Sequence, residues 1–229
     1  MGTSKGYISP TRVPWSNAKR AVGQLIKDSS MDNISRAASK FATAMKSDIG
    51  SAEYSSTFNS AAAGILGFIQ SVASSGVDNT LKEIGREDLI GRTSSEIWDE
   101  LLYYYTNDGK TEEDSLALDA LSLATKNLNL DMENLEKIES DIFLKEMIVD
   151  YINLKFEFHY EEKIGKKISP SEKGKILEKM KKYIRASVYE ELSLENISSI
   201  NFRKLDADKY VKEALHDAFN TLEDMYVGE

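Results

Sequence analysis

Proline is nearly absent from this chain beyond its first fourteen residues, and this absence limits which backbone structures the chain can form. Of three prolines in 229 residues, Pro10 and Pro14 lie near the start and only Pro170 lies further along. Proline disrupts helix interiors, so long stretches without it can remain helical. The chain is also rich in Ala, Leu, Glu and Lys, which favour helix. We therefore expect an all-α protein.

Apolar residues recur at steps of three and four along most of the chain, as the buried face of a helix requires. In residues 17–28 this stripe consists of Ala21, Val22, Leu25 and Ile26, with Ser16 as a candidate N-cap. The same spacing predicts further helices over 31–48, 51–75, 80–91, 94–109, 112–128, 141–165, 171–192 and from 206 to the end.

Two of these segments lead to more specific expectations. The segment 51–75 is apolar nearly all round, so we expect it to be the most buried helix. Its small residues Gly64 and Gly67 would let another helix approach closely. Thr111 followed by Asp114 predicts a capping box at the start of the helix that comes after them.

One segment is ambiguous, because the run YINLKFEF at 151–158 could also alternate as a strand. No breaker interrupts 141–165 and Asp141 is a candidate cap, which favours helix. We find no internal repeat and no sustained heptad. The expected organisation is a flexible N-terminal arm over 1–15 that precedes a single compact multi-helix bundle over 16–229.

The chain contains no cysteine, which excludes disulfide frameworks, thiolate zinc sites and cysteine nucleophiles. This composition fits a reducing compartment. The first residues lack the apolar stretch of a signal peptide. The most apolar run, 61–73, is shorter than the roughly 20 residues that span a bilayer. We therefore expect a cytoplasmic protein without a membrane partner.

Charge is unevenly distributed along the chain. The net charge is −9, yet residues 1–27 contain five basic residues and no acidic one, so the remainder carries −14. A body this acidic repels phosphate, and we expect no direct binding to nucleic acid. The basic leader could contact a phosphate or an acidic partner, or it could lie against its own acidic body.

Residues that could carry chemistry are few, and none forms a known constellation. His159 and His216 lie on different predicted helices without a third metal ligand nearby. Gly174-Lys175 lacks the flanking residues of a phosphate loop, and the triple tyrosine 103–105 lacks the basic residues of a base-stacking surface. A run of lysines is either a solvated helix face or a docking patch for an acidic partner: residues 173, 175, 179, 181 and 182. We predict no catalytic residue, no metal ligand and no cofactor.

The N-terminus itself has useful chemistry. Methionine followed by glycine is removed readily by methionine aminopeptidase, which would expose Gly2 as a free α-amine. The pKa of such an amine is about 7.7–8.0, so roughly a third is unprotonated near pH 7.5. Gly6 would let the segment thread a narrow pocket, and an extended arm of this length reaches on the order of 50 Å. An ordinary disordered terminus is the alternative interpretation.

Several segments resemble the QatB proteins of the four-gene Qat anti-phage system. The start, MGTS followed by a stretch of glycine, aromatic and proline residues and then Trp15, is similar to the start of these proteins. SRAASKFATAM is similar to their Ala-rich second segment, and the block from SAEYSS to WDELL is similar to their small-residue helix and the block after it. DALSLA and YIRASVYEEL resemble later helices. The resemblance covers roughly residues 1–192, and 193–229 is less familiar.

This resemblance implies a function for the N-terminus. QatB-like proteins are encoded beside an ATPase, a QueC-like enzyme and a TatD-like nuclease. The resemblance implies that the QueC-like enzyme attaches a deazaguanine-type group to the terminal amine of its QatB-like partner. Gly2 would then be the acceptor in this chain. Partner recognition would involve Thr3, Ser4, Lys5, Gly6 and Tyr7.

Three hypotheses follow for the protein. The first is a non-catalytic scaffold and substrate in anti-phage defence, with the QueC-like enzyme, the ATPase and the nuclease as partners. The second is a helical adaptor that binds the ATPase or the nuclease without modification of its N-terminus, so that deleting residues 2–12 changes nothing. The third is an enzyme in its own right, which the missing cysteines, clustered histidines and phosphate loop disfavour.

Overall fold

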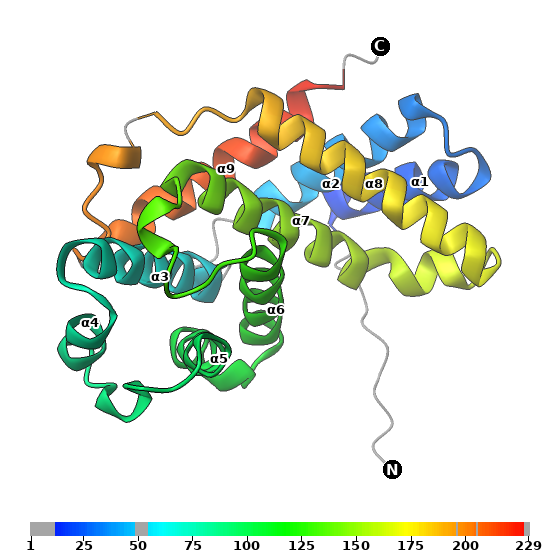
Figure 1. Ribbon diagram of the computed structural model, residues 1–229. Helices are drawn as coiled ribbons and strands as arrows, with labels where there is room; N and C mark the ends of the chain where they lie inside the picture. The colour runs from blue at the N-terminus through cyan, green and yellow to red at the C-terminus, as the bar shows by residue number, and fades with distance from the viewer. Residues whose placement is uncertain (1–11, 49–54, 196, 205, 227–229) are drawn as a thin grey trace. The chain divides into compact units, whose positions relative to one another are not determined.

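The computed structural model describes residues 12–48, 55–195, 197–204 and 206–226 (Figure 1). Within these ranges the regular structure consists of α-helices joined by turns and short 3₁₀ helices. The α-helices are α1 (Val13–Lys27), α2 (Met31–Asp48), α3 (Ser56–Ser75), α4 (Val77–Glu83), α5 (Ser94–Tyr105), α6 (Glu112–Asn127), α7 (Ser140–Gly165), α8 (Pro170–Glu191) and α9 (Ala207–Asp224). The 3₁₀ helices are η1 (Glu87–Leu89), η2 (Asn107–Gly109), η3 (Leu135–Lys137) and η4 (Ile197–Ser199).

The predicted all-α class is confirmed. The ambiguous run 151–158 is helical and lies inside α7. No strand occurs in the described part of the chain. None of the helices described combines the length and the apolar character that crossing a bilayer requires.

The chain groups into two compact units. Unit 1 consists of residues 1–51, 152–191 and 217–229, and unit 2 consists of residues 52–151 and 192–216. The units differ in charge, because unit 1 contains 18 basic and 14 acidic residues whereas unit 2 contains 11 basic and 24 acidic residues. The assignment of 16–229 to one domain stays a prediction.

In unit 1, α1 and α2 pack side by side (Figure 1). The predicted helix start at Ser16 is wrong, because α1 begins at Val13 with Pro14 in its first turn. Proline suits that turn, since its missing N–H has no partner within a helix there. Residues 13–15, which the sequence assigned to the arm, are therefore helical. The apolar residues that recur at steps of three and four within 31–48 form a buried stripe on α2: Ile34, Ala37, Ala38, Phe41 and Met45.

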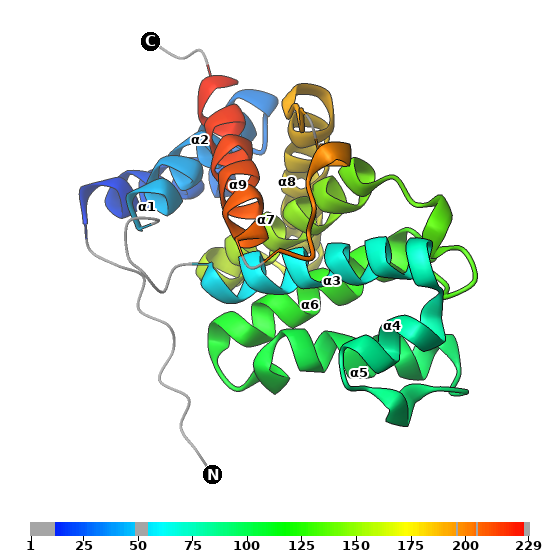
Figure 2. The same cartoon turned by 90° about the vertical axis from the view of Figure 1, so that its left-hand side faces the viewer.

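Unit 2 is built around α3, which packs against α4, α5, α6 and η3 (Figure 2). The prediction that this segment is strongly buried is confirmed, because Phe58, Ile65 and Leu66 are each at most 1% exposed. The ring of Phe58 stacks on that of Tyr151, with centroids 4.1 Å apart. Burial on nearly all sides explains why the segment lacks a clear polar face.

The two close approaches to α3 are not both made by helices. A Cβ at Gly64 would lie 2.5 Å from the ring of Tyr105, which belongs to α5. A Cβ at Gly67 would lie 2.8 Å from the backbone oxygen of Phe202, in the non-helical segment between η4 and α9. Gly64 therefore leaves space for one side chain of α5, and Gly67 leaves space for a stretch of non-helical backbone. The sequence had predicted the close approach of a helix at both residues.

The predicted capping box of α6 is confirmed, and its carboxylate also accepts hydrogen bonds from the side chains of Thr57 and Asn107. Thr111 accepts from the amide of Asp114, and the Asp114 carboxylate accepts from the amide of Thr111 at 3.0 Å. Asp114 is only 4% exposed and also accepts from the Thr57 hydroxyl at 2.7 Å. Burial raises the pKa of this carboxyl, but hydrogen bonds from Thr57 and Thr111 outweigh burial and lower the pKa below its ordinary value.

Candidate functional site

The residues that the sequence assigned to modification and recognition lie outside the described residues: Gly2, Thr3, Ser4, Lys5, Gly6 and Tyr7. The described structure closest to them in sequence is the start of α1. In the described part of the chain, no group of three or more His, Asp or Glu side chains could hold a metal ion. The candidate site is therefore built from the residues that hold the base of the predicted arm.

Arg12 and Trp15 fasten the start of α1 to the end of α2. The Arg12 guanidinium donates to Asp48 Oδ1 at 3.0 Å, and Trp15 Nε1 donates to Asp48 Oδ2 at 2.9 Å. The two donors are three residues apart, a spacing that brings side chains to the same side of a helix. Trp15 is 1% exposed, whereas Arg12 is exposed. One carboxylate thus holds two donors, and we call Arg12, Trp15 and Asp48 the arm anchor.

Aromatic packing reinforces the arm anchor. The ring of Trp15 lies 4.4 Å from that of His159 and 6.4 Å from that of Phe41, measured between centroids. Burial, together with the positive charges of Lys155 and Lys19, lowers the pKa of His159 to about 3. His159 is therefore neutral at physiological pH and acts as a packing partner of the tryptophan.

The sequence contained a signal for this anchor that the predicted boundary at residue 15 missed. Trp15, Ala18, Val22 and Leu25 follow steps of three, four and three, and all four are buried. This series extends the apolar stripe of α1 by one turn towards the N-terminus. The partner carboxylate at Asp48 is 33 residues away, and no local pattern points to it.

Two basic hollows lie beside α1. The first has a volume of about 390 Å³ and is lined by Asn17, Arg20, Ala21, Gln24, Arg36 and Lys40. Three cations and no carboxylate line it, which suits an anionic group.

The second hollow has a volume of about 250 Å³ and is lined by Lys19, Phe158, His159, Tyr160, Glu162, Lys163, Lys166 and Lys167. Burial lowers the pKa of Lys163, as do the nearby charges of Lys167 and Lys19. The Lys163 ammonium donates to the backbone oxygen of Lys19 and ties α7 to α1. The positive charge of the leader therefore continues onto folded parts of unit 1.

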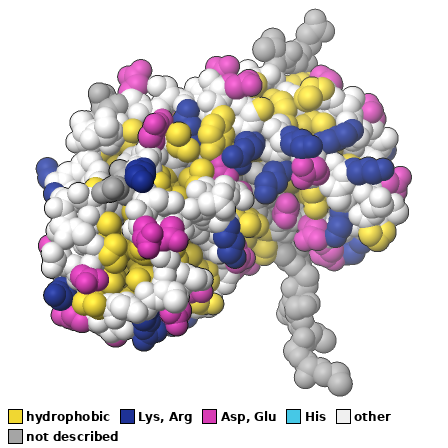
Figure 3. Space-filling view, in the orientation of Figure 1, with side chains coloured by type: hydrophobic (Ala, Val, Ile, Leu, Met, Phe, Trp, Pro, Cys, Tyr) yellow, Lys and Arg dark blue, Asp and Glu magenta, His cyan; other side chains and the backbone are white. Residues whose placement is uncertain are grey.

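The lysine run on α8 is mostly engaged within unit 1. Lys173 donates to Glu161 at 2.7 Å, and Lys182 pairs with Glu178 at 3.4 Å. Lys179 donates to the backbone oxygen and the hydroxyl of Ser29. Figure 3 shows carboxylates interspersed among the lysines and arginines of this face. These contacts favour the interpretation of a solvated helix face over that of a docking patch.

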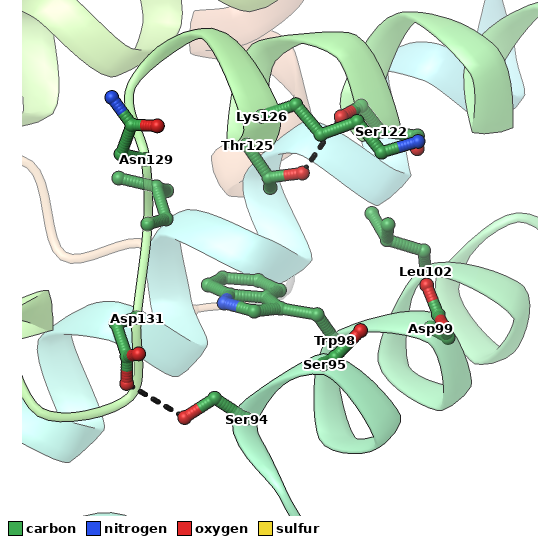
Figure 4. Close-up of a pocket in the computed structure, with 11 residues that line it drawn as sticks. Ser94, Ser95, Trp98, Asp99, Leu102, Ser122, Thr125, Lys126, Asn129 and Asp131 are labelled. Carbon is green, nitrogen blue, oxygen red and sulfur yellow. Dashed lines mark hydrogen bonds between the residues drawn. The ribbon is translucent and has the colours of Figure 1, made fainter.

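Unit 2 contains a separate pocket of about 440 Å³ between α5, the C-terminal half of α6 and the segment 129–131 (Figure 4). Trp98, Leu102 and Leu130 are the apolar residues of its lining, and the other lining residues are polar. The Ser94 hydroxyl donates to Asp131 at 2.6 Å and closes one end. This hydrogen bond and others from Glu133 and Met132 lower the pKa of Asp131. No sequence pattern had singled out this pocket, since its lining comes from three separate stretches.

Comparison with known proteins identifies the family. The model of a family described as Qat anti-phage system associated protein QatB matches residues 50–222. This range contains all of unit 2, and it includes 193–222, which the sequence resemblance left less familiar. It starts after the arm anchor. No curated protein and no solved structure matches the chain. Because the match covers well over half of the chain, the protein belongs to the QatB family of the Qat anti-phage defence system.

Proposed function

We propose that this chain is a non-catalytic component of the Qat system that acts as a scaffold and as the substrate of a QueC-like partner enzyme. The partner would attach a deazaguanine-type group to Gly2 after removal of Met1, and Thr3, Ser4, Lys5, Gly6 and Tyr7 would form its recognition segment. The observation that carries this proposal is membership of the QatB family. We propose the cytoplasm as its compartment, together with the ATPase and the TatD-like nuclease as further partners.

The chemistry of the modification requires only an amine from this chain. The unprotonated α-amine of Gly2 attacks a carboxyl carbon that the partner has activated with ATP. An amide C–N bond forms, the activating group leaves and the nitrogen loses a proton. An α-amine suits this step better than lysine, because its pKa is about 2.5 units lower. The catalytic groups belong to the partner.

The arm anchor supports the scaffold part of the proposal. An enzyme that draws residues 2–11 into its active site pulls on a chain that Arg12 and Trp15 hold to Asp48. A fixed attachment point limits the volume that the amine explores and raises its effective concentration near a docked partner. The hollow lined by Arg20, Arg36 and Lys40 begins within one turn of Trp15 along α1 and offers a surface for acidic groups of that partner.

The proposal is tested by coexpression with the QueC-like enzyme, followed by intact mass measurement and N-terminal sequencing. We expect a mass gain confined to the N-terminal peptide and loss of its free amine. Gly2→Leu should abolish the gain, because a large second residue prevents removal of Met1. Gly23→Ala is the matched control and should be fully modified, since a Cβ at Gly23 meets nothing within 4 Å. An unmodified Gly2 in the presence of active partner contradicts the proposal.

A helical adaptor without modification is the alternative, and a deletion distinguishes the two. Removal of residues 2–11 keeps the arm anchor intact, because Arg12 is retained. If the chain is a substrate, this deletion should abolish phage protection while complexes with the ATPase or nuclease persist. Unchanged protection would favour the adaptor.

A further inference from the structure

The pocket of unit 2 contains a buried donor that has no acceptor. Trp98 is 5% exposed, and its Nε1 has no hydrogen-bond partner among the described residues. Its ring packs edge-on against Phe68 with centroids 6.4 Å apart. Figure 4 shows the indole nitrogen directed away from α5, towards the segment that carries Asn129 and Asp131. A buried N–H without an acceptor is unfavourable, and a ligand that supplies an acceptor removes this penalty.

The wall opposite α5 is held in place by its own hydrogen bonds. Asp131 accepts from the Ser94 hydroxyl at 2.6 Å and from the Glu133 amide at 3.1 Å. Asn134 accepts from the amide of Asp131 at 2.9 Å and donates to the backbone oxygen of Asn129 at 3.3 Å. The pocket is therefore largely formed before any ligand enters, as is usual for binding sites.

The rim of the pocket has charged groups that remain available. Asp99 on α5 and Lys126 on α6 line the pocket and are exposed. Neither forms an ion pair in the described part of the chain. With Asp131, the lining contains two carboxylates and one ammonium, and unit 2 as a whole has an excess of acidic residues. The site therefore favours a ligand that brings a positive charge together with hydrogen-bond acceptors.

We propose that this pocket binds a short peptide segment of a partner protein that carries an arginine or lysine. A backbone carbonyl of the peptide accepts from Trp98 Nε1, and the basic side chain pairs with Asp99. A peptide meets both requirements, because its backbone presents carbonyl oxygens at regular spacing next to a charged side chain. The pocket volume of about 440 Å³ lies within the range of ligand sites. This inference does not depend on modification of Gly2.

The test follows the two indole N–H signals of the ¹⁵N-labelled full chain by NMR. The probe is acetyl-Gly-Arg-Gly-amide, and the matched peptide is acetyl-Gly-Glu-Gly-amide. We expect the Trp98 signal to move saturably with the arginine peptide, and less with the glutamate peptide at equal concentration. The Trp15 signal should stay fixed, because that donor is bonded to Asp48, and it serves as the internal control.

Two variants separate the contacts. Asp99→Asn changes an exposed side chain and should weaken binding of the arginine peptide about two- to fivefold. Binding of the glutamate peptide should stay unchanged or become tighter. Trp98→Phe keeps a ring against Phe68 but removes the donor. It should weaken binding of the arginine peptide about three- to tenfold. Because this variant lacks the Trp98 indole signal, its binding is measured from the NMR signal of the Asn129 amide. An unmoved Trp98 signal or an equal response to both peptides would each overturn the proposal.

Discussion

The indole nitrogen of Trp15 donates to Asp48 Oδ2 at 2.9 Å and joins the first turn of α1 to the last residue of α2. Asp48→Ala would leave this buried donor without an acceptor, so we expect the free energy of unfolding to fall by about 1–3 kcal/mol. Arg12→Ala removes the other donor of the anchor, whose side chain is 69% exposed. We expect that variant to cost less than about 1 kcal/mol. Urea denaturation of both variants checks this order, and equal losses would contradict it.

Gly67 is expected to tolerate no side chain. In Gly67→Ala the new Cβ would lie 2.8 Å from the backbone oxygen of Phe202, which cannot rotate away as a side chain can. We expect the free energy of unfolding to fall by about 1–3 kcal/mol. The matched variant is Gly174→Ala in α8, where a Cβ meets nothing within 4 Å; it should gain about 0.5–1 kcal/mol from helix propensity. Thermal melts of the pair distinguish the two signs, and stabilisation in both would rule out the clash.

His159 should make the protein less stable in mild acid. Its pKa is about 3 in the folded protein, because of burial and the nearby lysines, against an ordinary value of 6.5. Between these values the unfolded chain binds a proton that the folded chain does not. Stability is therefore present above pH 6.5 and decreases as the pH falls, with a slope that approaches about 1.4 kcal/mol per pH unit.

Chemical denaturation between pH 7.5 and 5 measures this slope. His159→Phe preserves an aromatic ring against Trp15 and should flatten the dependence. His216→Gln is the control and should retain the slope of the wild type. A slope that persists in His159→Phe would assign the effect to another group.

The capping boxes of α5 and α6 should differ in importance, because the one at α6 is buried and the one at α5 is exposed. Asp114→Ala removes the acceptor of the Thr57 hydroxyl and of the Thr111 amide. We expect a loss of about 2–3 kcal/mol in the free energy of unfolding. Glu96→Ala in the exposed box of α5, where Glu96 accepts from the Thr93 amide at 2.9 Å, should cost only about 0.5–1 kcal/mol. Guanidinium denaturation of both variants checks the ratio, and similar losses would mean that burial contributes little.

Local patterns predicted most helices well because helical spacing depends only on neighbours along the chain. The stripe on α2, the buried character of α3 and the capping box of α6 all follow from residues within a few positions of one another. The start of α1 was predicted at the wrong residue, because two prolines and an isolated tryptophan are typical of a loop. The residues that bury Trp15 are distant in the sequence, so local patterns did not reveal that it belongs to the helix. The resemblance to QatB proteins was likewise readable from the sequence and agrees with the family match.

The sequence alone determined the all-α class and the family, since each depends on local composition or on motifs contiguous in the chain. Only the tertiary structure could decide that Asp48 holds Trp15, that the carbonyl of Phe202 abuts Gly67, and that Trp98 faces a pocket without an acceptor. The physical reason is distance along the chain. Burial and hydrogen-bond satisfaction depend on groups that lie tens of residues apart or more, and no periodicity records which of them will meet.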